Sequence, residues 1–466
     1  MNEPNRTRLS RRGFLGGVTG AALAALGASS PAVAQAPALR SRQGGLPPNI
    51  VLIVLDDLGW GELGSYGQQV IRTPVLDGLA AEGLRFTQAY ANPSCAPTRA
   101  SLLTGLHTGH ARVKTNGDAA DGLLPEDVTV GEVLRSAGYR TGHIGKWGLG
   151  PDTGVNPSHP NSQGFDYFFG YINQRHAHDY WPTYLWRNDE QVRYPENESA
   201  NVTYATDLFT QEALDFIDRS QDGPFFLYLG YTTPHAPNEI PSDAPYSDED
   251  WPQGERNHAA QITHTDAEIG RVLARLDELG LAEDTLVLVT SDNGPHEAGE
   301  AFEHVGSTLP HDPEFFDSNG PLRGIKFTVY EGGIRVPLIV RLPAALRASG
   351  APTAASVVHD PVVVWDLLPT LAEVAGAQAP ANLDGMSFVP ALTGREQPSH
   401  EYLYWEHNGR NQAVRFGNWK AVRRNNRPVE LYHLNKDIGE LTDVAAEHLA
   451  LVRKAESLLA AAVEGH

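Results

Sequence analysis

Residues 49–55 read Asn-Ile-Val-Leu-Ile-Val-Leu, and two aspartates follow at once. The run is almost wholly apolar and rich in β-branched side chains, a pattern typical of a strand that is buried on both faces of a parallel sheet. Similar apolar runs recur at 225–229, 285–290 and 336–340. The sequence therefore predicts a sheet whose central strands are wholly buried.

Segments with a helical pattern separate these runs. Their apolar residues recur at helical spacing, and they span 128–137, 204–220, 258–279 and 361–375. Strands that alternate with helices predict an α/β fold, in which a large, mixed, mostly parallel sheet is sandwiched by helices. In such folds, ligands are expected at the carboxyl ends of the strands.

The composition changes near residue 395. Short strand-like pieces and a final helical pattern follow, at 402–406, 413–416, 419–423 and about 444–463. We expect a large α/β domain over 49–395. A smaller C-terminal α+β domain that carries an antiparallel sheet is expected over 396–466.

The first 34 residues resemble an export signal. The segment 10–15, Ser-Arg-Arg-Gly-Phe-Leu, precedes an Ala/Gly/Leu-rich run, and 32–34, Ala-Val-Ala, is a pattern that signal peptidases cut. The apolar run is too short for stable membrane insertion. The paired arginines are similar to a twin-arginine signal, although a disordered basic tail is an alternative. We expect export by the twin-arginine translocase of a bacterium, cleavage near Ala34, a linker over 35–48 and a periplasmic or secreted protein.

Composition excludes several classes of protein. The 466 residues are 41% hydrophobic and contain one cysteine, which excludes an internal disulfide and a cysteine-based zinc or iron–sulfur site. The formal net charge is -21, from 36 basic and 57 acidic residues. Loss of residues 1–34 removes four arginines and one glutamate and takes this charge to -24. A chain so acidic is a poor non-specific partner for nucleic acid, and an anionic substrate would need a local positive site.

Polar residues follow two of the predicted strands. Asp56 and Asp57 come directly after the first strand, and Asp292 and Asn293 come just after 285–290. Because the carboxyl ends of parallel strands meet at one edge of a sheet, these side chains could face one cavity. Their oxygens form a hard ligand set that suits Ca²⁺ or Mg²⁺ better than zinc. Each pair by itself is also typical of a strand-end turn or helix cap, and their matching placement favours the metal site.

The lone cysteine has an unusual setting. Residues 92–105 read Asn-Pro-Ser-Cys-Ala-Pro-Thr-Arg-Ala-Ser-Leu-Leu-Thr-Gly. A lone cysteine is by default a small buried hydrophobe, but Cys95 lies in a polar, proline-flanked turn that opens a predicted helix. Helix N-termini bind anions, and Arg99, one turn further on, adds a fixed cation.

The pattern Cys-x-Pro-[Ser/Thr]-Arg followed by Leu-Leu-Thr-Gly resembles the signature of the type I sulfatases, the formylglycine-dependent arylsulfatase family of the alkaline phosphatase superfamily. The five-residue pattern alone is weak, but further family motifs recur in family order from Asn49 almost to the C-terminus. They are Asp56-Asp57, Gly-Lys-Trp-Gly-Leu-Gly at 145–150, Ser-Asp-Asn-Gly at 291–294 and Tyr-Glu-Gly-Gly-Ile-Arg at 330–335. The chain is therefore identified as a member of this family.

The resemblance implies a nucleophile and a metal. In the family a formylglycine-generating enzyme oxidises the cysteine before folding, and the hydrate of the resulting aldehyde is the nucleophile; here that position is Cys95. The implied metal is Ca²⁺, with Mg²⁺ less favoured. Its implied ligands are Asp56, Asp57, Asp292, Asn293 and residue 95 in its modified form.

The resemblance also implies residues that handle charge and protons. Arg99, Lys146 and Lys326 would surround the hydrate and the sulfate oxygens, where fixed cations stabilise a charged transfer. Read without their motifs, the two lysines would be solvated surface charges. His235, in Thr-Pro-His-Ala-Pro, would protonate the leaving alcohol, since its ordinary pKa lies near neutrality. A turn histidine between two prolines is the alternative.

One position departs from the family pattern. The common motif is Gly-Lys-Trp-His-Leu-Gly, and its histidine partners the formylglycine, but Gly148 stands there in this chain. We hypothesise that His176 or His178 enters the site and partly takes over. The alternative is that the aromatic-rich segment around them is a substrate-binding lid whose aromatics pack as core. His107 is a further, weaker candidate for the site.

The predicted reaction is hydrolysis of a sulfate ester to an alcohol and inorganic sulfate, with an aryl sulfate or a sulfated carbohydrate as substrate. A hydrolase of phosphodiesters or phosphonate monoesters is the nearest alternative, because the same kind of site can bind a tetrahedral phosphoryl group. Phosphatases of this superfamily usually use Ser or Thr as the nucleophile and two metals held partly by histidines. The oxygen-only metal set and the cysteine signature argue against that alternative. A non-catalytic binder of sulfated glycans is a third possibility.

Overall fold

The computed structural model describes residues 46–299, 309–347 and 355–464. The predicted export signal, residues 1–34, and linker residues 35–45 lie outside the described residues. Within those described ranges, no helix is long and apolar enough to cross a membrane.

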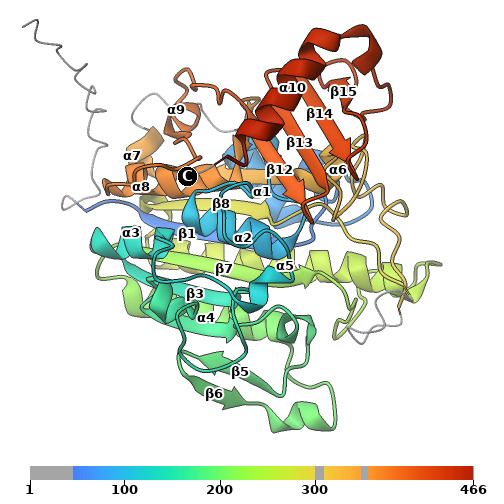
Figure 1. Cartoon of the computed structure of the whole chain (residues 1–466). Helices are drawn as coiled ribbons and strands as arrows, with labels where there is room; N and C mark the ends of the chain where they lie inside the picture. Colours follow the sequence, from blue (N-terminus) through green and yellow to red (C-terminus); the bar gives the residue numbers. More distant parts are fainter. Residues whose placement is uncertain (1–45, 300–308, 348–354, 465–466) are drawn as a thin grey trace, which may run out of the picture. The chain divides into compact units, whose positions relative to one another are not determined.

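The larger of two sheets has eleven strands, and its centre is the run quoted first (Figure 1). β1 (Asn49–Asp56) pairs in parallel with β7 (Phe225–Pro234) on one side and β8 (Thr285–Ser291) on the other. The strand order is β10-β2-β9-β8-β1-β7-β3-β4-β5-β6, with β11 paired to β2. The other strands are β2 (Leu84–Tyr90), β3 (Arg140–Lys146), β4 (Tyr167–Tyr171), β5 (Tyr184–Arg187), β6 (Glu190–Arg193), β9 (Arg335–Arg341), β10 (Ser356–Val358) and β11 (Val362–Val363).

Helices cover both faces of this sheet. Ile50, Leu52 and Val54 belong to one hydrophobic core, and the alternating residues Val51 and Ile53 belong to the other. The first core receives α2 (Cys95–Thr104), α3 (Val130–Ser136) and α8 (Leu367–Ala375), and the second receives α1 (Pro74–Glu82), α4 (Ala205–Ser220) and α5 (Gln253–Glu278). This alternation explains why the first strand has no polar face.

The second sheet has four antiparallel strands in the order β12-β13-β14-β15. They are β12 (Leu403–His407), β13 (Asn411–Phe416), β14 (Trp419–Arg424) and β15 (Glu430–His433), and α10 (Leu449–Ala461) packs on them. The indole N–H of Trp405 donates to the Ala91 carbonyl, 2.8 Å away, and so ties this sheet to the chain just before α2. The predicted fold class is confirmed, and the domain boundary near residue 395 stays a prediction.

The structure corrects one predicted helix. The pattern at 361–375 is α-helical only from Leu367, because Val362–Val363 forms the short strand β11 against β2 and Val364–Asp366 forms a 3₁₀ turn. The carboxylate of Asp366 accepts from the Val363 amide at 3.0 Å and so separates the strand from the helix. Three further short helices are α6 (Glu331–Ile334), α7 (Ala344–Arg347) and α9 (Val389–Leu392).

Candidate active site

Two neighbouring strands of the sheet bring the predicted carboxylates together. Asp56 ends β1 and Asp57 follows it, while Asp292 and Asn293 follow β8. The two strands are paired so that Leu55 lies opposite Ser291. Asp57 adopts a left-handed φ of 67°, and its amide donates to Asp292 Oδ1 at 3.1 Å. All four side chains are wholly buried.

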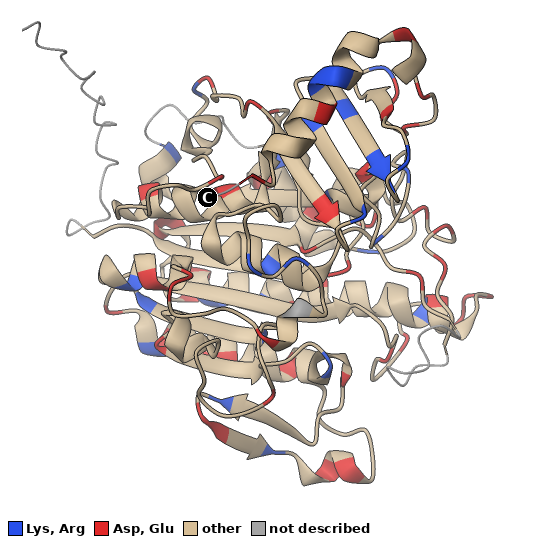
Figure 2. Cartoon of the chain, viewed as in Figure 1, with Lys and Arg blue, Asp and Glu red and all other residues tan. Residues whose placement is uncertain are grey.

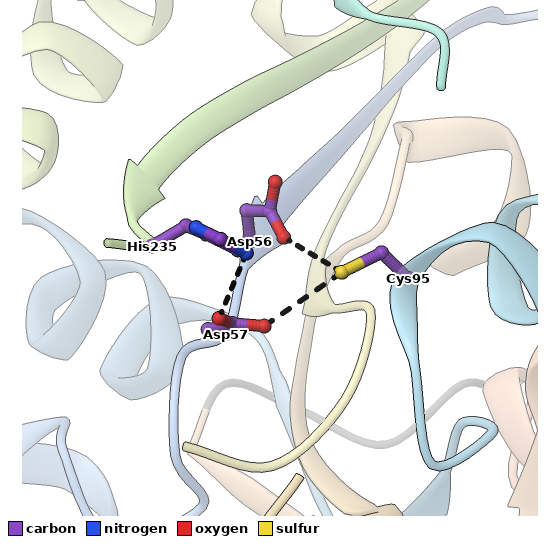
Figure 3. A group of neighbouring side chains, drawn as sticks. All are labelled: Asp56, Asp57, Cys95 and His235. Carbon is purple, nitrogen blue, oxygen red and sulfur yellow. Dashed lines mark hydrogen bonds and ion pairs between the residues drawn. The ribbon is translucent and has the colours of Figure 1, made fainter. Parts of the chain in front are cut away.

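Cys95 is the first residue of α2 and points at these carboxylates (Figure 3). Its Sγ lies 3.3 Å from Asp56 Oδ1 and 3.8 Å from Asp57 Oδ1, and the residue is 1% exposed. Burial, followed by the charges of Asp292 and Asp56, raises the pKa of this thiol well above its ordinary value. An unmodified Cys95 is therefore a protonated thiol at neutral pH, which makes it a weak nucleophile.

A buried cation lies against each buried carboxylate. Lys146 Nζ is 2.6 Å from Asp56 Oδ2, and Lys326 Nζ is 2.7 Å from Asp57 Oδ1. Arg99 grips Asp292 with two N–H groups, from Nε at 3.1 Å and Nη2 at 2.8 Å. The structure therefore brings together the three cations that the sequence motifs indicate.

The carboxylates have unequal proton affinities. Burial raises the pKa of Asp56, but the nearby Lys146 and other positive groups outweigh it and hold that pKa well below its usual value. Burial also raises the pKa of Asp57, and burial together with the charge of Asp56 raises that of Asp292 to about 7. The protein's own cations thus leave two of the three carboxylates under-compensated.

The donor set fits a hard dication. Asn293 Nδ2 donates to Asp57 Oδ1 at 2.6 Å, while Asn293 Oδ1 is buried with no hydrogen-bond partner among the described residues. A half-turn of this amide would exchange the two atoms and place the oxygen beside Asp57. Three carboxylates and an amide oxygen are ligands that Ca²⁺ and Mg²⁺ prefer.

His235 lies just after β7 and belongs to one group with Asp56, Asp57 and Cys95, whose possible ligand atoms all lie within 4.8 Å of one another (Figure 3). Its Nε2 is 3.4 Å from Asp57 Oδ2, and its Nδ1 faces the Ala236 carbonyl at 2.5 Å. Burial and the charge of Lys326 lower the pKa of His235 well below its ordinary value. The hydroxyl of Tyr180 donates to the carbonyls of Thr232 and His235, at 2.6 and 2.7 Å, and so fixes this turn.

The remaining histidines divide between the site and other places. The His178 ring lies 4.5 Å from that of His235, and burial and Lys146 lower the pKa of His178 to about 4. His176 turns instead toward Asp152, at 3.7 Å, and packs on Tyr171 and Tyr184.

His107 lies in a separate cluster. Its ring stacks on His110, with 4.4 Å between the ring centroids, and its Nε2 is 3.6 Å from Asp384 Oδ1. Of the three histidines that the sequence offered as extra site residues, the structure places His178 beside the machinery.

His296 is a site residue that the sequence analysis missed. It is buried, its Nδ1 lies 3.3 Å from Asp57 Oδ2, and its ring stacks on that of His235 at 5.6 Å. The available signal was its position two residues after Gly294, in the same strand-end loop as Asp292.

Comparison with known proteins agrees with this geometry. The family description Sulfatase matches residues 48–377, and the C-terminal region of N-sulphoglucosamine sulphohydrolase matches 325–460. The N-acetylgalactosamine-6-sulfatase of Canis lupus familiaris is 34% identical over 401 residues, which cover 80% of this chain and 71% of that protein. The N-acetylgalactosamine-6-O-sulfatase of Bacteroides thetaiotaomicron is 29% identical over 88% of this chain and 92% of its own length.

Among solved structures, Ps i-CgsB in complex with k-i-k-neocarrahexaose superposes with a TM-score of 0.76 at 28% identity, over 89% of this chain and 93% of that one. The chain belongs to the sulfatase family. It is a type I sulfatase of the alkaline phosphatase superfamily, an enzyme that hydrolyses sulfate esters. The family and the reaction predicted from sequence are confirmed, and the phosphonate alternative gains no support over them.

Proposed function

We propose that this sulfatase acts on a sulfated carbohydrate, with residue 95 as formylglycine and Ca²⁺ among the strand-end oxygens. The observation that carries the proposal is the position of Cys95, whose Sγ lies 3.3 Å from Asp56 Oδ1 amid buried carboxylates and cations. The Bacteroides relative is named for N-acetylgalactosamine-6-O-sulfate chemistry, and the solved structure holds a neocarrahexaose. Both names support a sugar rather than an aryl group.

Modification of Cys95 would replace a buried thiol of low nucleophilicity with a better nucleophile. Formylglycine supplies an aldehyde hydrate with two hydroxyls, one to attack sulfur and a second to expel sulfate afterwards. The fold leaves Cys95 1% exposed. We therefore propose that a formylglycine-generating enzyme acts on the chain before folding is complete.

Asp56, Asp57, Asp292 and Asn293 would hold the Ca²⁺, together with an oxygen of the modified residue 95. When bound, Ca²⁺ supplies positive charge that polarises the sulfate and favours the ionised form of a nearby hydroxyl. Asn293 Oδ1 supports this assignment because it is buried and the described chain leaves it unsatisfied. Mg²⁺ is the alternative ion, and it demands a more regular octahedron.

Arg99, Lys146 and Lys326 would stabilise the charge on the sulfate in the transition state. Each now lies within 2.6–2.8 Å of a carboxylate that the metal would share. Lysine and arginine N–H groups not taken up by these carboxylates can then donate to sulfate oxygens. Donors fixed in a buried site need little reorganisation, which makes such electrostatic terms large.

His235 would give a proton to the leaving alcohol from Nε2. The Ala236 carbonyl at Nδ1 favours a hydrogen on that nitrogen, and this leaves Nε2 facing the cluster. The pKa of His235 is low in a site without an anion. Binding of a negatively charged sulfate ester favours the imidazolium, so the acid form would be made when substrate is present.

We also propose a cellular location and a domain organisation for the chain. Residues 1–34 would be a twin-arginine signal that directs the folded enzyme to the periplasm or beyond it. The catalytic domain would span 49–395 and the smaller C-terminal domain 396–466.

Lys and Arg positions are dispersed over both sheets and the helices (Figure 2). Attraction of an anionic sugar would therefore depend on the buried cations of the site.

A substrate panel tests the proposed function. Sulfated mono- and oligosaccharides, an aryl sulfate and a phosphodiester are compared on enzyme made with a formylglycine-generating enzyme, with metal content measured on the same sample. We expect a sulfated saccharide to give the highest kcat/KM and Ca²⁺ to be the bound ion. A preference for the aryl sulfate or the phosphodiester would contradict the substrate class, and bound Mg²⁺ would contradict the ion.

A further inference from the structure

Gln174 places an unused hydrogen-bond donor at the edge of the active site. Its Nε2 is buried and has no hydrogen-bond partner within the ranges that the structure describes. A buried donor without a partner costs free energy, so native proteins rarely keep one without a reason. A donor left in this state beside an active site is typical of a group that a ligand completes.

The Gln174 amide fills the space next to Gly148. A Cβ added to Gly148 would lie 3.2 Å from Gln174 Nε2, 3.4 Å from Gln174 Cδ and 3.5 Å from Arg99 Cδ. The carboxamide therefore occupies the volume into which a side chain at position 148 would extend. Gly148 has a φ of +74°, a left-handed conformation that favours glycine. The backbone thus keeps this volume free for Gln174.

The loop that carries Gln174 is fixed to the site. It follows β4, and the carbonyl of Tyr171 at the end of that strand accepts from the Trp147 amide at 2.9 Å. Asn173 Oδ1 accepts from the His176 amide at 2.8 Å and shapes the turn. The glutamine is therefore presented by a packed segment next to the strand that carries Lys146.

The position also relates Gln174 to residue 95. Arg99 lies four residues after Cys95 on α2, and residues at this spacing share one face of a helix. The Gln174 amide and the Arg99 side chain both lie within 3.5 Å of the point that a Gly148 Cβ would occupy. A donor at this place is well situated for an oxygen carried by residue 95.

We propose that Gln174 Nε2 donates a hydrogen bond to the formylglycine hydrate at position 95, in the space that a histidine at position 148 would otherwise use. This inference rests on the proposed function. A neutral amide donates a hydrogen bond but does not titrate near neutral pH. The pH profile of this enzyme therefore lacks an ionisation from this position.

Gln174→Ala tests the contact kinetically. Loss of one donor to a reacting group lowers kcat by about 10²-fold, and we expect KM to change by less than about threefold because the sulfate-binding cations are untouched. Arg175→Ala, at the exposed neighbouring position, is the matched control and should keep wild-type kcat. Melting temperatures of both variants check that the loop stays folded.

A second readout does not depend on turnover. A hydrogen bond to the hydrate disfavours the free aldehyde, so an aminooxy reagent should label residue 95 several-fold faster in Gln174→Ala than in the wild type or in Arg175→Ala. Gln174→His should add to the pH profile of kcat an ionisation that the wild type lacks.

The outcomes separate this inference from the proposed function. Wild-type kcat and labelling rate in Gln174→Ala, in a protein whose residue 95 is formylglycine, would overturn the role of Gln174 and leave the proposed function intact. A fully active wild type with an unmodified thiol would overturn both. A lower kcat with faster labelling and unchanged folding is the result that supports the contact.

Discussion

The cluster at the ends of β1 and β8 and the cluster around Glu331 both bury acidic and basic groups, and they differ in how far the protein completes them. Glu331 Oε1 accepts from Lys420 Nζ at 2.9 Å, and its Oε2 accepts from the Tyr90 hydroxyl at 2.8 Å and from Arg335 at 3.1 Å. Lys420 also lies 3.1 Å from Glu440. Glu331 begins α6, just before β9 of the large sheet, and Lys420 lies on β14, so these bonds link the two sheets.

The active-site cluster is less complete. Asn293 Oδ1 and Gln174 Nε2 have no partner in the described part of the chain, and burial raises the pKa of both Asp57 and Asp292. By contrast, the pKa of Glu331 is lowered to about 2, because Lys420 and Arg335 outweigh the effect of burial. Burial of charge by itself therefore does not distinguish a structural network from a catalytic one. A raised carboxyl pKa does not distinguish them either, since the pKa of Glu440 in the second cluster is also raised, to about 7. What sets the active-site cluster apart is that a candidate nucleophile, Cys95, lies against its carboxylates.

Cys95→Ser should give the largest effect, and this effect should be a loss of activity without a loss of stability. Serine lacks the second hydroxyl that expels sulfate, so turnover should fall by at least about 10⁴-fold, as for loss of a nucleophile. The melting temperature should change little, because the side chains are nearly the same size. Initial rates on a sulfated saccharide measure the change. A serine variant within about tenfold of wild type would contradict the assignment.

Lys420→Met should show the opposite pattern. It leaves Glu440 buried without its cation and Glu331 with Arg335 as its remaining ion pair, which costs about 3–5 kcal/mol of unfolding free energy. Chemical denaturation measures that loss, and kcat per folded molecule should remain within about twofold of wild type. A stable but inactive variant would show that this cluster takes part in the reaction, which the comparison denies.

Lys146→Ala removes a cation from the active-site cluster, as Lys420→Met removes one from the cluster around Glu331. We expect kcat/KM to fall by about 10²–10³-fold, the usual loss for one preorganised charge on a reacting group. The loss of unfolding free energy should be smaller than in Lys420→Met once Ca²⁺ is bound, since the metal would compensate Asp56. Kinetics and denaturation on the same preparation give both numbers. A loss of unfolding free energy equal to that of Lys420→Met would show that Lys146 mainly stabilises the fold, as Lys420 does.

Glu440 gives the smallest predicted effect, a pH dependence of stability. Burial raises the pKa of Glu440 to about 7, against about 4.3 for an unfolded glutamate. Between these values the folded state keeps a proton that the unfolded state has lost, so stability falls as pH rises through this window. Glu440→Gln should flatten the fall between pH 5 and 7 in denaturation curves. An unchanged slope would refute the shift.

The sequence predicted the parts of the site that follow from strand ends. Asp56, Asp57, Asp292 and Asn293 lie at the ends of two fully buried strands that pair in parallel, and this pairing brings them together. Cys95 and Arg99 could be placed because a proline-flanked turn opens their helix. The central strands were predicted for the same reason, since burial on both faces leaves an unbroken apolar run.

Features that depend on tertiary packing could not be predicted. β2, β5 and the edge strand β6 carry mixed polar and apolar residues, because their surroundings differ from face to face. Gln174 lies in an irregular loop, and its relation to Gly148 depends on the pairing of β3 with β4. His296 could have been suspected from its position just after Gly294, but it lies in a loop, where no sequence periodicity indicates which way a side chain points.

The chemical state of residue 95 tests the central claim most directly. Peptide mass spectrometry of enzyme made with and without a formylglycine-generating enzyme measures the converted fraction, and sulfate release is measured on the same samples. The account predicts a Cys95 peptide lightened by exchange of sulfur for oxygen and loss of two hydrogens, with activity proportional to its abundance. Full activity from a protein whose Cys95 remains an intact thiol would contradict it.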